Sequence, residues 1–161
     1  MSEKEWRIRL LTGGEISLGC KVFGGEIDYR RVRIFREKYV FFQPVDTTMA
    51  PDGDIWLHPK SALACGSAME DFSKASLGIR AHFIHEMTHV WQYQHGIDPI
   101  AEKVCMFFRH GPRGGYHYTL VPGKIFTDYN IEQQACIIAD IYLARCKGKP
   151  FELTPLGTPV V

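Results

Sequence analysis

One long stretch with helical periodicity, Leu77 to Tyr93, constrains most strongly how this chain of 161 residues can fold. Apolar side chains recur along it at three- and four-residue intervals, which places them on one face of a helix. That face comprises Ile79, Phe83, Ile84, Met87, Val90 and Trp91. Gly96 predicts where the helix ends. The chain must therefore bury one side of this helix in its core, and the other side is open for another purpose.

The opposite side carries the two histidines of the sequence His85-Glu86-Met87-Thr88-His89, a His-Glu-x-x-His motif. Residues four apart on a helix differ by about 40° around its axis, so both imidazoles can bind one tetrahedral ion. Glu86 lies beside that face and can take a proton from water without being a ligand. The motif predicts a zinc site with His85 and His89 as ligands and Glu86 as general base. Short motifs recur by chance, but the division of this helix into two faces favours a real site.

A catalytic zinc site needs a third protein ligand and one open position. Gln92 and His95 follow the motif at spacings that do not supply this ligand. Glu132 is our candidate, because it lies on a predicted helix over residues 130–147 that is apolar almost all round. A carboxylate on a buried apolar face is costly unless it is paired or bound to a metal.

Two alternatives to this choice stay open. Glu132 falls in the first turn of its helix, where an acidic side chain can simply stabilise the helix N-terminus. Asp140, two turns further along, is the second candidate ligand. Its rotated position favours a different role, as a hydrogen-bonding partner of a ligand histidine.

The other elements predict an α+β fold. Thr12 and Glu15 have the spacing of a capping box, which starts a helix that runs to Phe23. Residues 29–42 are rich in Val, Ile, Tyr and Phe and predict two strands, and residues 54–58 predict a third strand stopped by Pro59. We expect one domain over residues 1–161, with a small antiparallel or mixed sheet packed on the motif helix and a second helix that bears Glu132.

Composition excludes several classes of partner. The net charge is +1, so we expect neither nucleic acid nor a membrane as a partner. The N-terminus lacks the pattern of a signal peptide, and no apolar run approaches the roughly 18 residues of a membrane span. We therefore expect synthesis in the cytoplasm. The number of cysteines is odd and they form no Cys-x-x-Cys pair, which argues against a disulfide framework or a cysteine-rich zinc site.

Two segments together carry a resemblance to a known family. Phe83-Ile-His-Glu-Met-Thr-His-Val-Trp-Gln92 and Asn130-Ile-Glu-Gln-Gln-Ala135 resemble the zincin-like domains attached to VgrG and Rhs proteins of type VI secretion systems, within the Glu-zincin group of metallopeptidases. Residues 11–13, 23–29 and 55–57 share the resemblance, which thus spans most of the chain. No spike domain is present in the sequence, so we expect a free-standing relative or a single domain of a longer protein.

The resemblance implies a zincin-like metallopeptidase with one Zn²⁺ ion bound by His85, His89 and Glu132, and with Glu86 as the base. It also implies an antibacterial effector that is secreted and delivered to the periplasm of a target cell. The expected partners are a peptide or protein substrate, including cell-envelope peptides, a cognate immunity or inhibitor protein, and the VgrG or Rhs secretion machinery.

The predicted reaction is hydrolysis of a peptide bond, in which Glu86 takes a proton from zinc-activated water and returns it to the leaving amine. A glycine-rich segment over residues 110–123 is expected to be irregular and can bend over the cleft. Its residues Tyr116, His117 and Tyr118 are candidate oxyanion donors, with Tyr118 preferred, although ordinary strand aromatics fit them equally well. Residues 54–58 are a candidate edge strand that pairs with an extended peptide. Three further histidines are expected to be structural or exposed: His58, His82 and His110.

Two other functions fit the sequence. The first is a non-catalytic zincin-like module that docks on secretion machinery with a structural zinc. The intact Glu86 argues against it, because a structural site has no use for a water-activating carboxylate. The second is an intracellular regulatory protease, which the absence of a signal peptide suits equally well.

Overall fold

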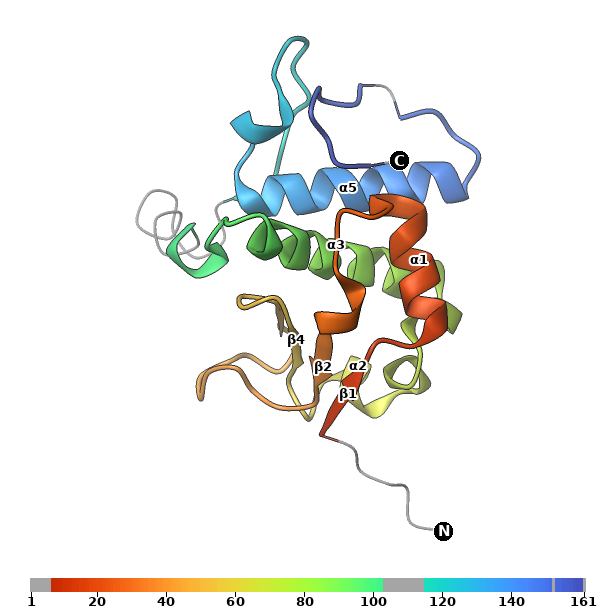
Figure 1. The fold of residues 1–161 in the computed structure, drawn as a ribbon, viewed down its shortest axis with the longest axis vertical. Coiled ribbons are helices and arrows are strands. Elements are labelled where there is room, and N and C mark those ends of the chain that lie inside the picture. Colours follow the sequence, from red (N-terminus) through yellow and green to blue (C-terminus); the bar gives the residue numbers. More distant parts are fainter. Residues whose placement is uncertain (1–6, 103–114, 152, 161) are drawn as a thin grey trace.

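Helix α3 (Leu77–Gln94) lies between the sheet and helix α5 (Ile131–Cys146), as Figure 1 shows. The fold comes from a computed structural model, which describes residues 7–102, 115–151 and 153–160. The α+β expectation is confirmed at this level, with helices and a small mixed sheet. The single-domain expectation over residues 1–161 stays a prediction.

In the part of the chain that the structure describes, four short strands form the sheet in the order β1-β2-β4-β3. They are β1 (Ile8–Leu10), β2 (Arg33–Phe35), β3 (Thr48–Met49) and β4 (Ile55–Leu57). The β1–β2 and β3–β4 pairs are antiparallel, whereas β2 and β4 run parallel. The predicted strand at residues 54–58 is present, but the expectation that it is an edge strand is wrong. The parallel pairing puts β4 inside the sheet, and β3 is the outer strand on that side.

The second strand predicted within residues 29–42 is also wrong, because residues 39–42 form a turn. The buried side chain of Gln43 organises this turn. Its amide oxygen accepts a hydrogen bond from the Tyr39 backbone at 2.8 Å, and its amide nitrogen donates to the Thr47 carbonyl at 2.8 Å. Phe41 and Phe42 consequently point outward, with 86% and 69% of their surface exposed. The apolar composition that predicted a strand here belongs to an exposed turn.

The capping box at the start of α1 (Gly13–Phe23) is confirmed. The Thr12 hydroxyl accepts from the Glu15 backbone at 3.1 Å, and the Glu15 carboxylate accepts from the Thr12 backbone at 2.8 Å. Glu15 is fully buried, and Arg9 donates to both of its oxygens at 2.6 and 2.7 Å. The Phe72 backbone donates a fourth hydrogen bond to this carboxylate, at 2.9 Å. A buried carboxylate is stable here because its hydrogen-bonding capacity is used.

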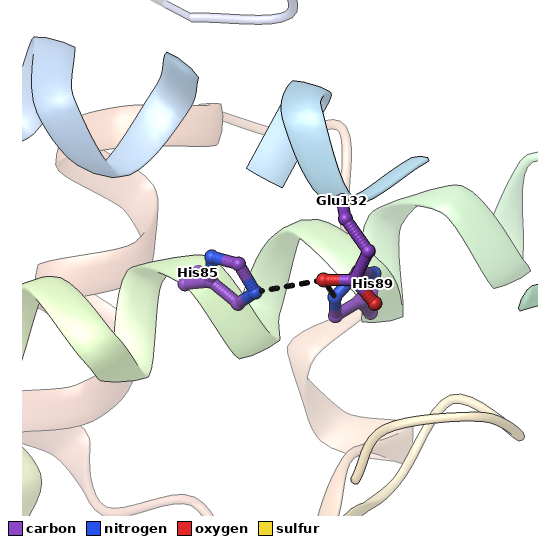
Figure 2. Close-up of side chains that lie close together, drawn as sticks. All are labelled: His85, His89 and Glu132. Atoms are coloured by element: carbon purple, nitrogen blue, oxygen red, sulfur yellow. Dashed lines mark ion pairs between the residues drawn. The ribbon is translucent and has the colours of Figure 1, made fainter. Parts of the chain in front are cut away.

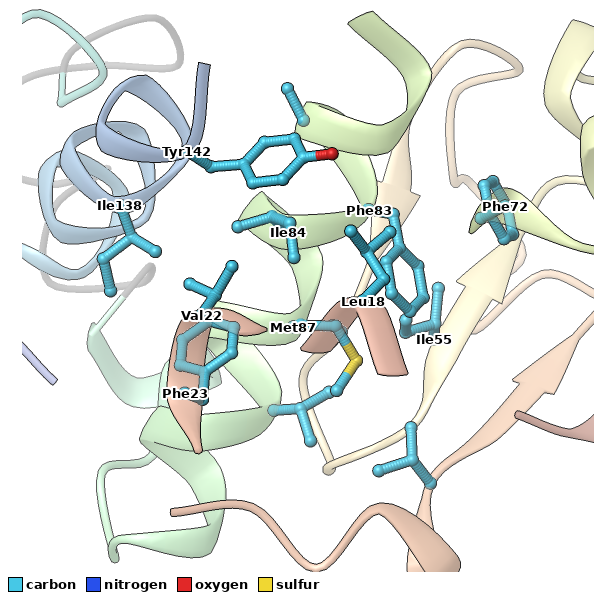
Figure 3. Close-up of a cluster of buried hydrophobic side chains, with 14 of the residues drawn as sticks. Leu18, Val22, Phe23, Ile55, Phe72, Phe83, Ile84, Met87, Ile138 and Tyr142 are labelled. Atoms are coloured by element: carbon cyan, nitrogen blue, oxygen red, sulfur yellow. The ribbon is translucent and has the colours of Figure 1, made fainter. Parts of the chain in front are cut away.

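The apolar face predicted for α3 faces the core that Figure 3 shows. Ile84 and Met87 are fully buried there, between α1 on one side and α5 on the other. Phe72 lies parallel to Phe83 with ring centroids 5.4 Å apart, which closes the core on the side of the short helices. These short elements are η1 (Tyr29–Arg31), α2 (Ala62–Cys65), η2 (Ser67–Met69), η3 (Phe72–Lys74) and η4 (Phe126–Asp128).

The remaining expectations concern cysteines and membrane spans. Cys20, Cys65, Cys136 and Cys146 are free thiols, and Cys105 lies outside the described residues. In the described parts of the chain, no helix has both the length and the apolar character needed to cross a bilayer. Residues 110–114 of the glycine-rich segment, which include His110, also lie outside the described residues. The rest of this segment, residues 115–123, forms neither helix nor strand.

Candidate metal centre

Three side chains from two helices converge at one point between α3 and α5. His85 and His89 lie one turn apart on α3, and Glu132 lies in the first turn of α5, facing them (Figure 2). The Glu132 Oε2 atom is 3.3 Å from Nε2 of His85 and 3.3 Å from Nε2 of His89. These three candidate ligand atoms all lie within 4.8 Å of one another.

The distances from Glu132 to the two histidines fit a small tetrahedral ion. Bonds of about 2.1 Å at tetrahedral angles place neighbouring ligand atoms about 3.3 to 3.5 Å apart, and both contacts to Glu132 Oε2 have this length. His89 and Glu132 are almost entirely buried, at 1% and 2% exposure, and the His85 side chain is 15% exposed. The group could therefore hold a metal ion that solvent reaches from the side of His85.

The start of α5 fixes where Glu132 lies. The Asn130 side chain accepts from the Gln133 backbone at 2.9 Å, and the Gln133 side chain accepts from the Asn130 backbone at 3.1 Å. This capping box begins the helix just before Glu132. The Glu132 carboxylate thus lies in the first turn of α5 and also contacts both histidines. A role in stabilising the helix N-terminus and a role as metal ligand are therefore compatible.

Gln92 connects one candidate ligand to the second helix. Its amide nitrogen donates to the Ile131 carbonyl at 3.0 Å and to Gln134 Oε1 at 2.9 Å, which orients the amide. Its amide oxygen then faces His89 Nδ1 at 2.8 Å and accepts the proton of that nitrogen. The Nε2 lone pair of His89 is thereby directed at Glu132 and at the space where an ion would bind.

Sequence reasoning missed this role of Gln92, and it proposed Asp140 as the partner of a ligand histidine. The structure places Asp140 elsewhere in the site, where its Oδ2 accepts from the Tyr118 hydroxyl at 2.5 Å. The sequence did contain a feature that could have indicated this role of Gln92. It lies three residues after His89, so it shares a helix face with that histidine.

The environment of His85 favours its protonated form while no metal is bound. Burial lowers the pKa of His85, but contacts with Cys136 and Glu132 and the negative charge of Glu86 outweigh it and raise the pKa to about 9. The contact with Cys136 joins Sγ and His85 Nδ1 at 4.0 Å. At neutral pH a proton therefore occupies His85 in the metal-free protein, and it has to leave when a metal binds.

A cavity of about 1030 Å³ opens beside this group, and His85 and Glu86 line it together. Its walls come from α3, from residues 46–48 at the outer strand β3, from residues 116–120 and from α5. Glu86 is 5% exposed and faces this space. His82, to which the sequence assigned no role, also lines the cavity, and its Nε2 is 3.6 Å from Glu86 Oε1.

Tyr118 lies in the wall of the same cavity, within the irregular segment over residues 116–120. Burial and the hydrogen bond to Asp140 raise the pKa of Tyr118 above its usual range. The phenol is therefore a neutral hydrogen-bond donor at all ordinary pH values. Its proton points to Asp140 in this structure.

Comparisons with known proteins agree on one relative. The chain is 44% identical over 138 residues to the type VI secretion system spike protein VgrG2b of Pseudomonas aeruginosa (strain PAO1), a match that covers 85% of this chain and 13% of that protein. The solved effector domain of Pseudomonas aeruginosa VgrG2b matches with a TM-score of 0.75 and 43% identity, covering 90% of this chain and 78% of that one. No family model matches.

The chain therefore belongs to the family of the VgrG2b effector domain. It spans only 13% of the length of the spike protein, so the likeness is to the effector part and not to the spike as a whole.

Proposed function

We propose that this chain is a zinc-dependent metallopeptidase that hydrolyses peptide bonds. The observation that carries the proposal is the convergence of His85, His89 and Glu132 beside an open cavity that Glu86 also lines. Two imidazole nitrogens and one carboxylate oxygen form the ligand set of one class of catalytic zinc site, in which the fourth position stays open. The mixture of nitrogen and oxygen donors also suits zinc better than calcium or magnesium.

A zinc ion in this group would act as a Lewis acid that lowers the pKa of water from about 15.7 towards about 7. Glu86 is the proposed general base, since it follows a ligand directly in sequence and faces the cavity. Its carboxylate accepts the proton of the attacking water and returns it to the leaving amine. Tyr118 is the proposed oxyanion donor, a role in which its hydroxyl turns from Asp140 towards the substrate carbonyl.

The outer strand β3 is the proposed place for an extended peptide. It takes over the role that the sequence suggested for residues 54–58, which lie inside the sheet. Thr47 and Thr48 line the cavity, so a peptide added to this edge would pass His85 and Glu86. Backbone hydrogen bonds along a free strand edge are a common way to hold a peptide.

The relationship to a spike-protein effector domain supports a place in type VI secretion. We propose an antibacterial effector that is made in the cytoplasm, associates with VgrG or Rhs machinery and acts on peptides or proteins of the target periplasm. A cognate immunity protein would protect the producing cell. A docking module with a purely structural metal fits less well, because a structural zinc site is normally closed by four protein ligands and this group opens on a cavity.

The decisive experiment measures zinc content and proteolysis on the same samples. The purified chain is expected to bind one zinc ion and to cleave fluorescein-labelled casein until a chelator removes the metal. Glu86→Gln should keep the zinc and lose about 10²- to 10⁴-fold in rate, because only the proton transfer is removed. His85→Ala and Glu132→Ala should lose the metal as well. The control is Glu26→Ala, an exposed carboxylate that contacts His95 away from the candidate ligands, and it should change neither the zinc content nor the rate of proteolysis.

Expression in bacteria separates the proposed cellular roles. Export to the periplasm should be toxic, while cytoplasmic expression and exported Glu86→Gln should not. Toxicity confined to the cytoplasm would favour an intracellular protease. Zinc binding to Glu132→Ala as tight as to the wild type would refute Glu132 as a ligand.

A further inference from the structure

We propose that His82 is a positioning residue that holds the carboxylate of Glu86 in place and couples it to the edge strand β3. The inference rests on the proposed function, in which Glu86 is the general base. His82 lies on α3 one turn before Glu86 and opens on the same cavity, with 38% of its side chain exposed. It belongs to neither the predicted ligands nor the core.

A single nitrogen of His82 faces two groups. Its Nε2 lies 2.9 Å from the hydroxyl oxygen of Thr48 and 3.6 Å from Oε1 of Glu86. The ring also lies parallel to the ring of His85, at 4° and with centroids 6.4 Å apart. His82 thus stands between the outer strand of the sheet and the proposed base, beside the first histidine of the motif.

His82 and Glu86 are four residues apart on α3, and the contact with Thr48 distinguishes them from an ordinary pair at this spacing. A surface histidine can swing into solvent, but His82 is held by a hydroxyl on a different element. Among the described residues, His82 brings its Nε2 atom to 3.6 Å from the Glu86 carboxylate. A general base has to stay within hydrogen-bonding reach of the proton that it accepts, so a partner that restricts its rotation raises the rate.

The same contact links the base to substrate binding. Thr48 lies on the strand edge where we place the peptide, so a bound peptide packs over the residue that orients His82. Loss of His82 should therefore lower kcat, which depends on the position of Glu86, more than it changes KM. Zinc affinity should stay the same, because His82 is not among the three candidate ligands.

The test compares variants of the full chain, loaded with zinc, on fluorescein-labelled casein. His82→Ala should lower kcat about 10- to 100-fold, the range found when the partners that orient a metal site's functional groups are removed, with KM within about twofold. His82→Gln should recover most of this loss, because its amide nitrogen can occupy the position of Nε2. Thr48→Val should fall between the wild type and His82→Ala. The matched control is His95→Ala, which removes a histidine beyond the other end of α3 that contacts Glu26 and should leave kcat unchanged.

Equal kcat for His82→Ala and the wild type would overturn the proposal, as would His82→Gln being as impaired as His82→Ala. A second readout does not depend on turnover. Acetohydroxamic acid binds a zinc site and uses the neighbouring carboxylate as a hydrogen-bond partner, so its affinity should fall about tenfold in His82→Ala and return in His82→Gln. If the wild type cleaves no casein, the proposed function fails, while equal hydroxamate affinities of all three proteins would separately refute the role of His82.

Discussion

Gln92 is the buried residue that ties the candidate metal centre to its surroundings. It accepts from His89 and donates to the first turn of α5 through Ile131 and Gln134. Gln92→Leu should lower zinc affinity about 10- to 100-fold, because His89 loses the partner that fixes its orientation. A competition assay with a colorimetric chelator measures this change.

The matched control for Gln92 is Gln94 on the same helix. Its side chain accepts from the Asp28 backbone at 2.8 Å and so joins α3 to a different part of the fold. Gln94→Leu should lower the free energy of unfolding without changing zinc affinity. Equal zinc affinity in Gln92→Leu and Gln94→Leu would contradict the orienting role of Gln92.

The pH dependence of metal binding follows from His85. Its pKa of about 9 lies above the ordinary 6.5, so the proton on His85 stabilises the metal-free protein fully below pH 6.5, and this stabilisation is lost as the pH rises through 9. Zinc needs the neutral imidazole, so its affinity for the folded chain should rise with pH up to about 9 and then level off. Calorimetry in buffers of different ionisation enthalpy should detect proton release on zinc binding at pH 7.5, and no release at that pH would contradict the raised pKa.

The residues of the motif could be predicted because helical spacing translates directly into positions in space. His85, Glu86 and His89 needed only the period of α3, and Gln92 was within reach of the same rule. The contact between His82 and Thr48 was not predictable, because Thr48 lies on a strand whose place beside α3 depends on the order of the sheet.

At the level of elements, the capping box of α5 supports the third candidate ligand. Asn130→Ala should lower the free energy of unfolding by about 0.5 to 2 kcal/mol, because it removes the acceptor for the Gln133 backbone. It should also weaken zinc binding, since Glu132 lies in the turn that this cap orders. Urea unfolding and chelator competition measure the two effects.

Ser61→Ala provides the comparison, because Ser61 caps the short helix α2 away from the site. A similar loss of stability is expected there, with no change in zinc affinity. Equal zinc affinities of Asn130→Ala and Ser61→Ala would show that the position of Glu132 does not depend on the Asn130 cap.

The limits of the helices were more predictable than the strands. Helices expected over residues 77–93 and 130–147 are observed at Leu77–Gln94 and Ile131–Cys146, because Asn130 caps the start of α5 and Gly96 and Gly148 follow the ends of the two helices. The turn at residues 39–42 had the composition of a strand, and only the tertiary contacts of Gln43 decide otherwise. Nothing local in the sequence shows that β2 and β4 pair in parallel, and that pairing placed β4 inside the sheet.

For the molecule as a whole, removal of zinc should lower the melting temperature without unfolding the chain at 25 °C. A ligand present at 100 to 1,000 times its Kd stabilises a protein by about 2.7 to 4.1 kcal/mol, which corresponds to roughly 5 to 15 °C at this size. The core over α1, the sheet and α3 consists of apolar side chains and includes none of the three candidate ligands, so it should persist. Differential scanning calorimetry with and without chelator checks this, and Glu132→Ala should melt at the same temperature in both conditions.

The ligands are divided unequally between two helices, two on α3 and one on the opening turn of α5. An ion in that position would clamp one end of the helix pair, while the other end is held by apolar contacts around Ile138 and Tyr142 (Figure 3). Slow amide exchange near Glu132 should therefore depend on metal loading, while exchange near Tyr142 should not. The ion would then set the gap between the helices, and under the proposed function a chain that met zinc only after delivery would acquire a rigid cleft on arrival.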